Sequence, residues 1–220
     1  MRFCFRFRST SAFCGIFWHR RPAMRSDMSL LTRWIQPNER VLDLGCGDGE
    51  LLAHLKREKN VSGYGMEIDT QNILKCVERQ VDVIQQDLNE GLAYVDDQSF
   101  DTVIMTQSLQ QTREPDLLLE EILRIGKRAI ISFPNFGHWT TRFYLGFRGK
   151  MPITRSLPFR WYDTPNIRLI TFKDFEILCR EHGIRILKKT VVDNEHAENW
   201  KVKMFPNILG EIALYHIEKI

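Results

Sequence analysis

The chain has 220 residues, of which 43% are hydrophobic and 27% are charged, and its formal net charge is +3. These values are typical of one globular domain with a sizeable core and exclude a low-complexity or collagen-like chain. The charge is uneven, because residues 1–23 carry five arginines and no acid, which leaves 3 − 5 = −2 for the rest. A slightly acidic domain is a poor general binder of nucleic acid, so we expect no nucleic-acid partner.

The five cysteines stand at positions 4, 14, 46, 76 and 179, and no two have the C-x-x-C spacing. Their odd number and their spacing predict neither a disulfide framework nor a zinc site, as is usual in a reducing cytoplasm. No apolar run approaches the roughly 20 residues that a membrane helix needs. We therefore predict a cytoplasmic protein with no membrane association.

Residues 1–23 are interpreted separately from the rest. Their arginines and lack of acids would suit a targeting peptide. However, the apolar piece 12–18 is short, and a basic His-Arg-Arg run follows it in place of a cleavage site of small residues. We favour the alternative that translation starts at Met24. Residues 1–23 are then a disordered or wrongly assigned extension, and residues 24–220 form a single domain.

Short apolar runs alternate with helical patterns between residues 26 and 134. Apolar runs bounded by turn residues predict strands, and apolar residues spaced three or four apart predict helices. We expect strands at 39–45, 61–68, 81–84, 100–106 and 127–133, and helices at 26–35, 50–58, 70–79 and 116–125. This alternation indicates an α/β fold with a parallel sheet and right-handed crossovers.

The pattern changes after Pro134. Residues 134–170 are rich in proline, glycine, aromatic residues and arginine and have little periodicity, so we interpret them as a lid inserted into the domain. A capping box at 171–174 then predicts a helix to about residue 182. Strands are expected at 184–192 and 211–217, with a loop at 194–210 between them. The two final strands predict an antiparallel pair that completes the sheet.

The most informative stretch is 41–50, VLDLGCGDGE, in which three glycines follow an apolar run at every second position. This order predicts a strand, a tight turn and a helix. Glycine is required where the backbone takes a positive φ or approaches a ligand closely. The helix N-terminus after such a turn offers unpaired N–H groups. We therefore expect a ligand at Gly45, Gly47 and Gly49.

Three acids, Asp43, Glu67 and Asp87, follow the first three predicted strands. In a doubly wound sheet the carboxyl ends of the strands meet at the edge where ligands bind. An acid near the glycine turn suits an ammonium group, one after the second strand can accept both ribose hydroxyls, and one after the third can accept from an adenine amino group. Together they predict a cationic adenosyl ligand. The alternative, that they are only helix caps, is disfavoured because all three are in register.

A dinucleotide is the main competing ligand. Its fingerprint is G-x-G-x-x-G, but this chain has Glu50 where the third glycine belongs. Asp48 and Glu50 would also repel a pyrophosphate, and no Walker A lysine is present. These residues favour the adenosyl ligand.

The glycine turn, Glu67 and Asp87 resemble those of the class I S-adenosylmethionine-dependent methyltransferases over residues 41–132. The resemblance implies an α/β, Rossmann-like fold with a mostly parallel seven-stranded sheet, an antiparallel last strand and helices on both faces. It also implies S-adenosylmethionine or S-adenosylhomocysteine as the ligand, with the glycines against the methionine moiety, Glu67 on the ribose and Asp87 near the adenine. The implied cofactor-binding residues are Asp43, Gly45, Cys46, Gly47, Gly49, Glu67, Ile68, Asp87, Leu88 and Gln107, and no metal ligand is implied.

A narrower resemblance covers nearly the whole chain from Met24 onward. The matching segments are 43–52 (DLGCGDGELL), 108–111 (SLQQ), 132–139 (SFPNFGHW), 151–154 (MPIT), 160–166 (RWYDTPN) and 207–211 (NILGE). They resemble the methionine-biosynthesis protein MetW family. That family implies a role beside homoserine O-acyltransferase (MetX), in which it supports the acylation of homoserine. A methyl acceptor is not an established part of that role.

The sequence contains no clear catalytic motif for methyl transfer. Residues 106–110 (TQSLQ) replace the Asn/Asp-Pro-Pro-Tyr of amine methyltransferases. The candidate general bases are His138, Tyr162 and Asp163, although each has a structural alternative as a turn cap, a packing residue or a turn residue. The alternative function is that of a stand-alone small-molecule methyltransferase, in which the lid would hold the methyl acceptor.

Six basic residues are interleaved with eight aromatic residues within 134–170. Such mixing occurs in nucleic-acid sites, but the acidic domain argues against that reading. Arginine and aromatic residues are also enriched at protein interfaces. We rank a partner interface first, an ordinary lid with solvated arginines second, and a lid over an anionic substrate third.

Overall fold

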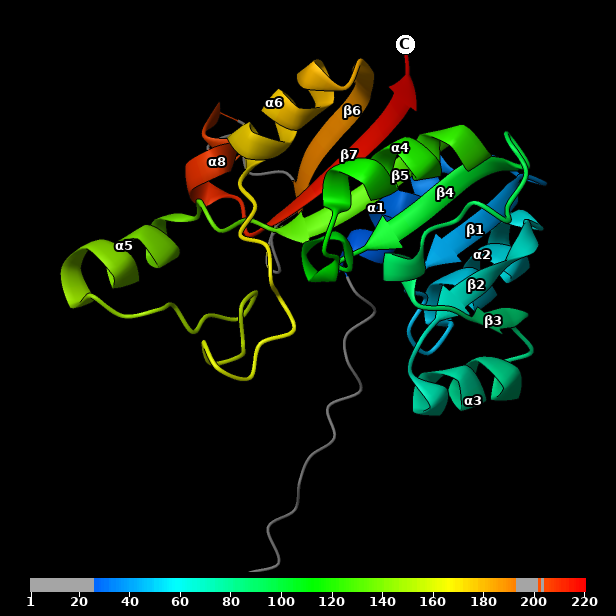
Figure 1. The fold of residues 1–220 in the computed structure, drawn as a ribbon, viewed down its shortest axis with the longest axis horizontal. Coiled ribbons are helices and arrows are strands. Elements are labelled where there is room, and N and C mark those ends of the chain that lie inside the picture. The colour runs from blue at the N-terminus through cyan, green and yellow to red at the C-terminus, as the bar shows by residue number, and fades with distance from the viewer. Residues whose placement is uncertain (1–25, 193–201, 203) are drawn as a thin grey trace, which may run out of the picture.

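The computed structural model describes residues 26–192, 202 and 204–220 (Figure 1). The interpretation of residues 1–23 as an extension lies outside these residues. No helix within the described ranges has the length and apolar character needed to cross a membrane.

Seven strands form one sheet in the order β3-β2-β1-β4-β5-β7-β6. The strands are β1 (Arg40–Leu44), β2 (Ser62–Glu67), β3 (Val83–Gln85), β4 (Phe100–Thr106), β5 (Gly126–Pro134), β6 (Ile184–Val192) and β7 (Ile212–Lys219). Strands β1 to β5 pair in parallel, whereas β7 runs antiparallel to both β5 and β6. The order reverses between β1 and β4, which is the switch point where ligands bind in open α/β sheets.

Helices cover both faces of the sheet (Figure 1). The α-helices are α1 (Ser26–Trp34), α2 (Glu50–Lys59), α3 (Thr70–Glu78), α4 (Pro115–Ile125), α5 (Trp139–Arg148), α6 (Phe172–Glu181) and α8 (Pro206–Leu209), and the short 3-10 helices are η1 (Leu88–Glu90) and η2 (Leu109–Gln111). The predicted α/β class, the mostly parallel seven-stranded sheet and its antiparallel last strand are confirmed.

The core consists of two apolar clusters, one on each face. Val41 joins the cluster that includes residues of α1, α2 and α3, while Leu42 joins the cluster that includes residues of α4 and α6. Neighbouring residues separate in this way because successive side chains of a strand point to opposite faces. Both faces of β1 are therefore buried, which explains why it reads as a continuous apolar run.

Two elements differ from the predicted pattern. Strand β3 begins at Val83 rather than at Val81, because the Val81 N–H donates to the Cys76 carbonyl and so belongs to the turn after α3. Residues 134–170 are not wholly irregular, since they contain α5. Only Thr141 of that helix is buried, so it has no apolar stripe for a periodicity search to find.

The predicted loop at 194–210 is only partly within the described residues. Its last part contains the four-residue helix α8. The Asn135 amide nitrogen donates to the carbonyls of Asn207 (3.1 Å) and Gly210 (2.8 Å), so α8 is fixed to the end of β5.

Candidate functional site

The glycine turn between β1 and α2 has the backbone conformation that its spacing predicts. Gly45, Gly47 and Gly49 have φ values of 68°, 56° and 73°. All three lie in the left-handed region, which side chains with a Cβ rarely adopt. The turn is also fixed to β2, since the N–H groups of Gly45 and Cys46 both donate to the Met66 carbonyl, at 2.8 and 3.1 Å.

The three glycines have different surroundings. A Cβ on Gly45 would lie 2.5 Å from the Ser108 hydroxyl oxygen, and one on Gly49 would lie 2.9 Å from the Cys76 sulfur. A Cβ on Gly47 would meet nothing within 4 Å. Gly47 is therefore the glycine of this turn that has open space beside it for a ligand.

The Glu67 carboxylate, at the end of β2, binds the glycine turn to the start of α3. Its Oε2 accepts from the Gly47 N–H at 2.8 Å, and its Oε1 accepts from the N–H groups of Ile68 and Asp69, both at 2.9 Å. The side chain is 9% exposed. Three backbone donors thus hold this carboxylate in one orientation at the edge of the cavity.

The acids after the strands are not a uniform set of helix caps. Asp43 is 1% exposed and lies within β1, and Glu67 bonds the turn as described. Asp87 does cap a helix, because its Oδ1 accepts from the backbone N–H of Asn89 (2.9 Å) and from the amide of the same residue (2.8 Å). Asp69, which the sequence reading omits, caps α3 through the Asn72 N–H.

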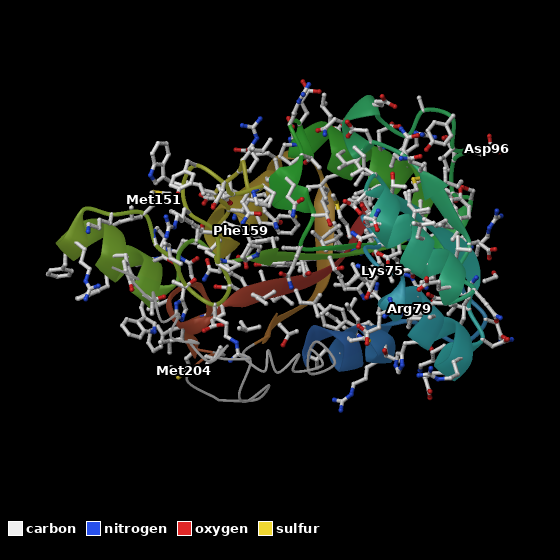
Figure 2. All side chains as sticks on the ribbon, turned by 90° about the horizontal axis from the view of Figure 1, so that it is seen from below. Lys75, Arg79, Asp96, Met151, Phe159 and Met204 are labelled. Atoms are coloured by element: carbon white, nitrogen blue, oxygen red, sulfur yellow. The ribbon has the colours of Figure 1, made fainter. Side chains whose placement is uncertain are left out.

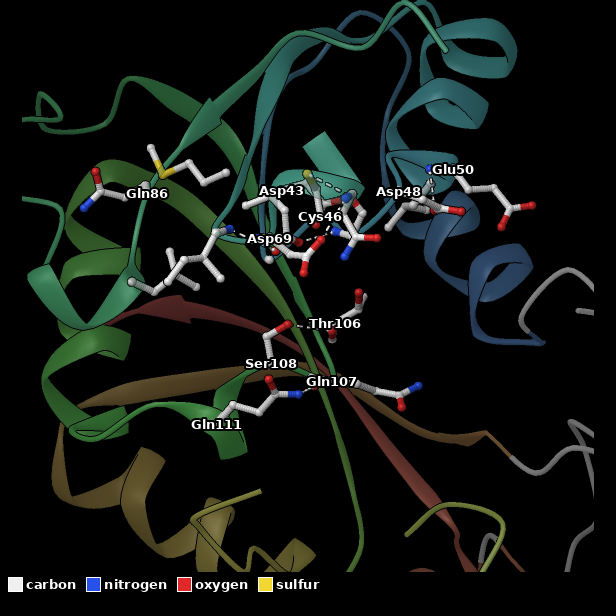
Figure 3. Close-up of a pocket in the computed structure, with 18 of the residues that line it drawn as sticks. Asp43, Cys46, Asp48, Glu50, Asp69, Gln86, Thr106, Gln107, Ser108 and Gln111 are labelled. Atoms are coloured by element: carbon white, nitrogen blue, oxygen red, sulfur yellow. Dashed lines mark hydrogen bonds between the residues drawn. The ribbon is translucent and has the colours of Figure 1, made fainter. Parts of the chain in front are cut away.

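The opposite wall of the cavity follows β4. Gln107 has a φ of 52°, and its N–H donates to the Ser132 carbonyl at 2.8 Å. Its own carbonyl accepts from the side-chain amides of Gln110 (2.6 Å) and Gln111 (3.2 Å). Figure 3 shows this wall, with Thr106, Ser108 and Gln111, facing the wall of the glycine turn across open space.

The two walls enclose a cavity of about 770 Å³. Six carboxylates and one lysine line it: Asp43, Asp48, Glu50, Glu67, Asp69, Asp87 and Lys75. A volume of this size suits a small-molecule ligand. The excess of carboxylates favours a cation with hydroxyl and amino groups and disfavours a diphosphate.

Two cysteines lie behind the turn with their sulfur atoms 3.8 Å apart. The Cys76 thiol donates to the Gly47 carbonyl at 3.2 Å. Burial, together with the nearby carboxylates, raises the pKa of the Cys46 thiol, and burial is also the main cause of the raised pKa of Cys76. Both therefore stay protonated near neutral pH and act as packing groups.

Most residues proposed as cofactor-binding line this one cavity. They are Asp43, Gly45, Cys46, Gly47, Glu67, Ile68, Asp87, Leu88 and Gln107. Gly49 is not among the lining residues, because it faces α3 and begins α2.

The three candidate general bases lie outside the lining of the cavity. His138 caps α5, with its Nδ1 2.7 Å from the Thr140 hydroxyl oxygen. The Tyr162 side chain is 60% exposed, and its hydroxyl accepts from Arg160. Asp163 accepts from the Arg160 N–H at 2.7 Å, within a local turn.

The sequence reading does not include several cavity residues. Met28 and Leu31 of α1 line the cavity, but their helical spacing indicates only a core position. Thr112 also lines it, and nothing local in the sequence marks that residue. Ser108 and Gln111 also line it; they lie in the 108–111 segment, whose family resemblance does not by itself predict contact with the ligand.

Comparisons with known proteins identify a family for most of the chain. The family model "Methionine biosynthesis protein MetW" matches residues 25–217. The "Bifunctional methionine biosynthesis protein MetXA/MetW" of Rhodopirellula baltica is 34% identical over 209 residues, which cover 88% of this chain and 33% of the relative. This chain therefore spans about a third of the curated relative that it matches.

Solved structures share the fold at low identity. A SAM-dependent methyltransferase from Archaeoglobus fulgidus has a TM-score of 0.65 at 18% identity, covering 89% of this chain and 92% of its own. An S-adenosylmethionine-dependent methyltransferase from Mesorhizobium loti has a TM-score of 0.64 at 14% identity, and the match covers 88% of this chain and 98% of that one. The [4+2]-cyclase SpnF has a TM-score of 0.60 at 18% identity, and the match covers 88% of this chain and 81% of that one.

The fold is thus that of the class I methyltransferases. A family model that covers most of the residues and a relative at 34% identity agree on the family. The chain belongs to the MetW family of methionine-biosynthesis proteins.

Proposed function

We propose that this MetW-family domain binds S-adenosylmethionine or S-adenosylhomocysteine and supports the activity of a homoserine O-acyltransferase (MetX). The observation that carries the proposal is the cavity of about 770 Å³ with six carboxylates and an open Gly47 at its wall. Both ligands carry an ammonium group, ribose hydroxyls and an adenine amino group, all of which donate hydrogen bonds. A wall rich in acceptors matches these donors and opposes phosphate.

Glu67 keeps acceptor capacity for the ribose. A carboxylate has about four lone-pair sites, and the described residues supply three donors, of which Oε2 accepts one. A ribose hydroxyl can therefore bind Oε2 without displacing the glycine turn. At Asp87, both hydrogen bonds from Asn89 go to Oδ1, so Oδ2 is the expected acceptor for the adenine amino group.

The partner is proposed from the relative in which the two names are joined. The R. baltica protein is named as bifunctional MetXA/MetW, so both names apply to one protein. We propose that this MetW-family domain reaches a similar arrangement by binding to an acyltransferase.

Support of the partner does not require methyl transfer. The three candidate bases lie outside the cavity lining, and a fold alone does not determine the reaction. One structural neighbour with this fold is named as a [4+2]-cyclase and not as a methyltransferase. Because S-adenosylmethionine is made from methionine, a ligand-dependent effect on acylation would report the output of the pathway.

The test is co-purification with the homoserine O-acyltransferase of the same organism, followed by an acylation assay. We expect the two proteins to co-elute and the acylation rate to rise with the concentration of this domain until it saturates. Equal rates with and without the domain, at concentrations where both proteins associate, would refute the support of activity.

The second candidate function is a stand-alone small-molecule methyltransferase, which the structural neighbours favour. Its test is transfer of a labelled methyl group from S-adenosylmethionine to any metabolite in a cell extract. A labelled product would support it. Intact ligand binding without any product would favour the first function.

A further inference from the structure

The segment 139–169, here called the arm, projects from the sheet at the end of β5 (Figures 1 and 2). It consists of α5 and the extended chain that returns toward α6. In Figure 2, Met151 and Phe159 lie on this projection, well away from Lys75 and Arg79 beside the cavity. The arm therefore presents a surface distinct from the ligand site.

Large apolar side chains are concentrated on the arm. Of the 23 large hydrophobic residues that are exposed among the described residues, eleven are in the arm: Trp139, Phe143, Leu145, Phe147, Met151, Ile153, Phe159, Trp161, Tyr162, Ile167 and Leu169. Phe147 is 83% exposed and Trp161 is 73% exposed. Exposed aromatic residues at this density are a feature of interaction sites rather than of ordinary surface.

The charge of the arm is opposite to that of the body. The arm has six basic residues and one acid, a net charge of 6 − 1 = +5. The rest of residues 26–220 has 19 basic residues and 27 acids, a net charge of −8. Within the described ranges, none of the ten ion pairs includes a residue of the arm.

Two arm cations, Arg148 and Arg160, lie over aromatic rings instead. The Arg148 guanidinium is 5.1 Å from the ring centre of Tyr144 and 5.9 Å from that of Phe143. Arg160 is 5.9 Å from the ring centre of Tyr162. Their charges are thus available to carboxylates of a second protein, and the rings beside them supply apolar contact area.

Both ends of the arm are bonded to the body. At the start, Asn135 is 1% exposed and bonds the loop that follows α8, and the Phe136 N–H donates to the Ile170 carbonyl at 2.9 Å. At the return, the N–H groups of Ile167 and Arg168 both donate to the Gln110 carbonyl at 3.0 Å. These hydrogen bonds fix both ends of the arm to the body. Gln110 lies in η2, next to Gln111, which lines the cavity.

We propose that the arm is the surface by which this domain docks on its acyltransferase partner, an inference that rests on the proposed function. The partner surface that fits is an apolar groove bordered by carboxylates, because the arm offers exposed aromatic residues flanked by arginines that form none of the ion pairs found among the described residues. Helix α8 is fixed to the base of the arm. Phe205, which precedes this helix, and Ile208 within it extend the apolar surface, being 54% and 41% exposed.

The test compares two double variants of the full chain by titration against the acyltransferase. The arm variant is Phe147→Ser with Trp161→Ser. The matched control is Val77→Ser with Leu117→Ser, which removes two apolar side chains that are 62% and 51% exposed on α3 and α4. We expect the arm variant to weaken binding by about 100-fold, as for aromatic hot spots, and the control by less than about threefold. Both variants should bind S-adenosylhomocysteine as the wild type does, which shows that they are folded.

The outcomes separate this inference from the proposed function. If the wild type binds the acyltransferase and the arm variant binds equally well, the docking surface lies elsewhere and the proposed function stands. If the wild type does not bind at all, the proposed function fails and the docking assignment fails with it. If sedimentation shows that the wild-type chain self-associates through Phe147 and Trp161, a second copy covers the arm, and the proposal is overturned.

Discussion

The ligand cavity and the arm are built in opposite ways. The cavity is lined by carboxylates, of which Asp43 and Glu67 are buried, and by backbone groups that are already hydrogen-bonded, with Glu67 accepting from three N–H groups. The arm exposes most of its aromatic residues, and its backbone hydrogen bonds to the rest of the described chain lie near its ends. A small ligand binds best to a preorganised site. An exposed apolar surface, in contrast, becomes buried only when a protein partner covers it.

The proposed function assigns the ligand to the cavity and the partner to the arm, and neither role requires a catalytic motif. The candidate bases His138, Tyr162 and Asp163 belong to the arm or its base and not to the cavity lining. The two regions nevertheless meet at η2, where the Gln110 carbonyl accepts from the arm. The predictions below separate the two regions or disturb the sheet that both share.

The largest expected effect comes from acid, which should destabilise the sheet under both regions. His216 of β7 is 4% exposed, stacks on Trp34 and has no hydrogen-bond partner for either ring nitrogen among the described residues. Burial, with Arg128 and Lys188 nearby, lowers its pKa to about 4 from the usual 6.5. Between these values only the unfolded chain binds the proton, so the free energy of unfolding should fall by about 3 kcal/mol as the pH drops from 6.5 to 4.

The check is denaturant unfolding at several pH values for the wild type and His216→Phe. The variant keeps a ring beside Trp34 but cannot titrate, so its slope against pH should be smaller by the contribution of His216. Comparing slopes removes any constant change in stability. Identical slopes in the two proteins would show that His216 is not the group responsible.

Glu67→Ala should damage the cavity and leave the arm unchanged. The variant removes the proposed ribose acceptor and the partner of the Gly47, Ile68 and Asp69 N–H groups. We expect a loss of about 2–3 kcal/mol in S-adenosylhomocysteine binding, or about 30- to 150-fold in Kd. Calorimetric titration measures this, with the exposed Glu58→Ala as the control. A Kd within a factor of two of the wild type would show that Glu67 is misassigned.

A pair of glycine variants compares the two regions directly. A Cβ on Gly65 would lie 2.4 Å from the Cys46 sulfur and 2.8 Å from its Cβ, so Gly65→Ala should displace the glycine turn. We expect about a tenfold loss of ligand affinity, since overpacking costs about 1–3 kcal/mol.

The matched change in the arm is Gly146→Ala, where a Cβ would meet nothing within 4 Å. Gly146 lies inside α5, so alanine should stabilise that helix by about 0.5–1 kcal/mol. Ligand affinity should be unchanged, and thermal unfolding measures the gain. If Gly146→Ala weakens ligand binding as much as Gly65→Ala does, the two regions are not separable in this way.

The smallest effect is expected at the rim of the cavity. Arg79 pairs with Asp48 of the glycine turn at 2.7 Å, and the two side chains are 39% and 40% exposed. Such pairs contribute about 0.2–1 kcal/mol, so Arg79→Ala should change the ligand Kd by less than about fivefold. A loss as large as that of Glu67→Ala would mean that the rim, and not the buried carboxylate, organises the turn.

The sequence predicts those parts of the molecule that depend on local chemistry. The glycines at 45, 47 and 49 imply positive φ values because few other residues tolerate them, and the structure has all three. Strand β1 is predictable because burial on both faces requires a continuous apolar run. The antiparallel pairing of β7 with β6 is also predictable, because the sequence pattern places two strands at 184–192 and 211–217 with only a loop expected between them.

The remaining features depend on contacts between distant residues. Glu67 holds the Gly47 N–H across 20 positions, so the sequence suggests its ligand role but not its bonds to the turn. Helix α5 lacks an apolar stripe because only Thr141 is buried in it. The stack of His216 on Trp34 joins the two ends of the chain, and no local pattern indicates it.

The central claim is that this domain acts on acylation by binding and not by methyl transfer. The most direct measurement is the rate of homoserine acylation by the acyltransferase, with this domain added in the presence of S-adenosylhomocysteine, which has no methyl group to donate. We predict that the rate rises above that of the acyltransferase alone. A rate that rises only with S-adenosylmethionine, together with methylation of the acyltransferase or its substrate, would contradict the claim.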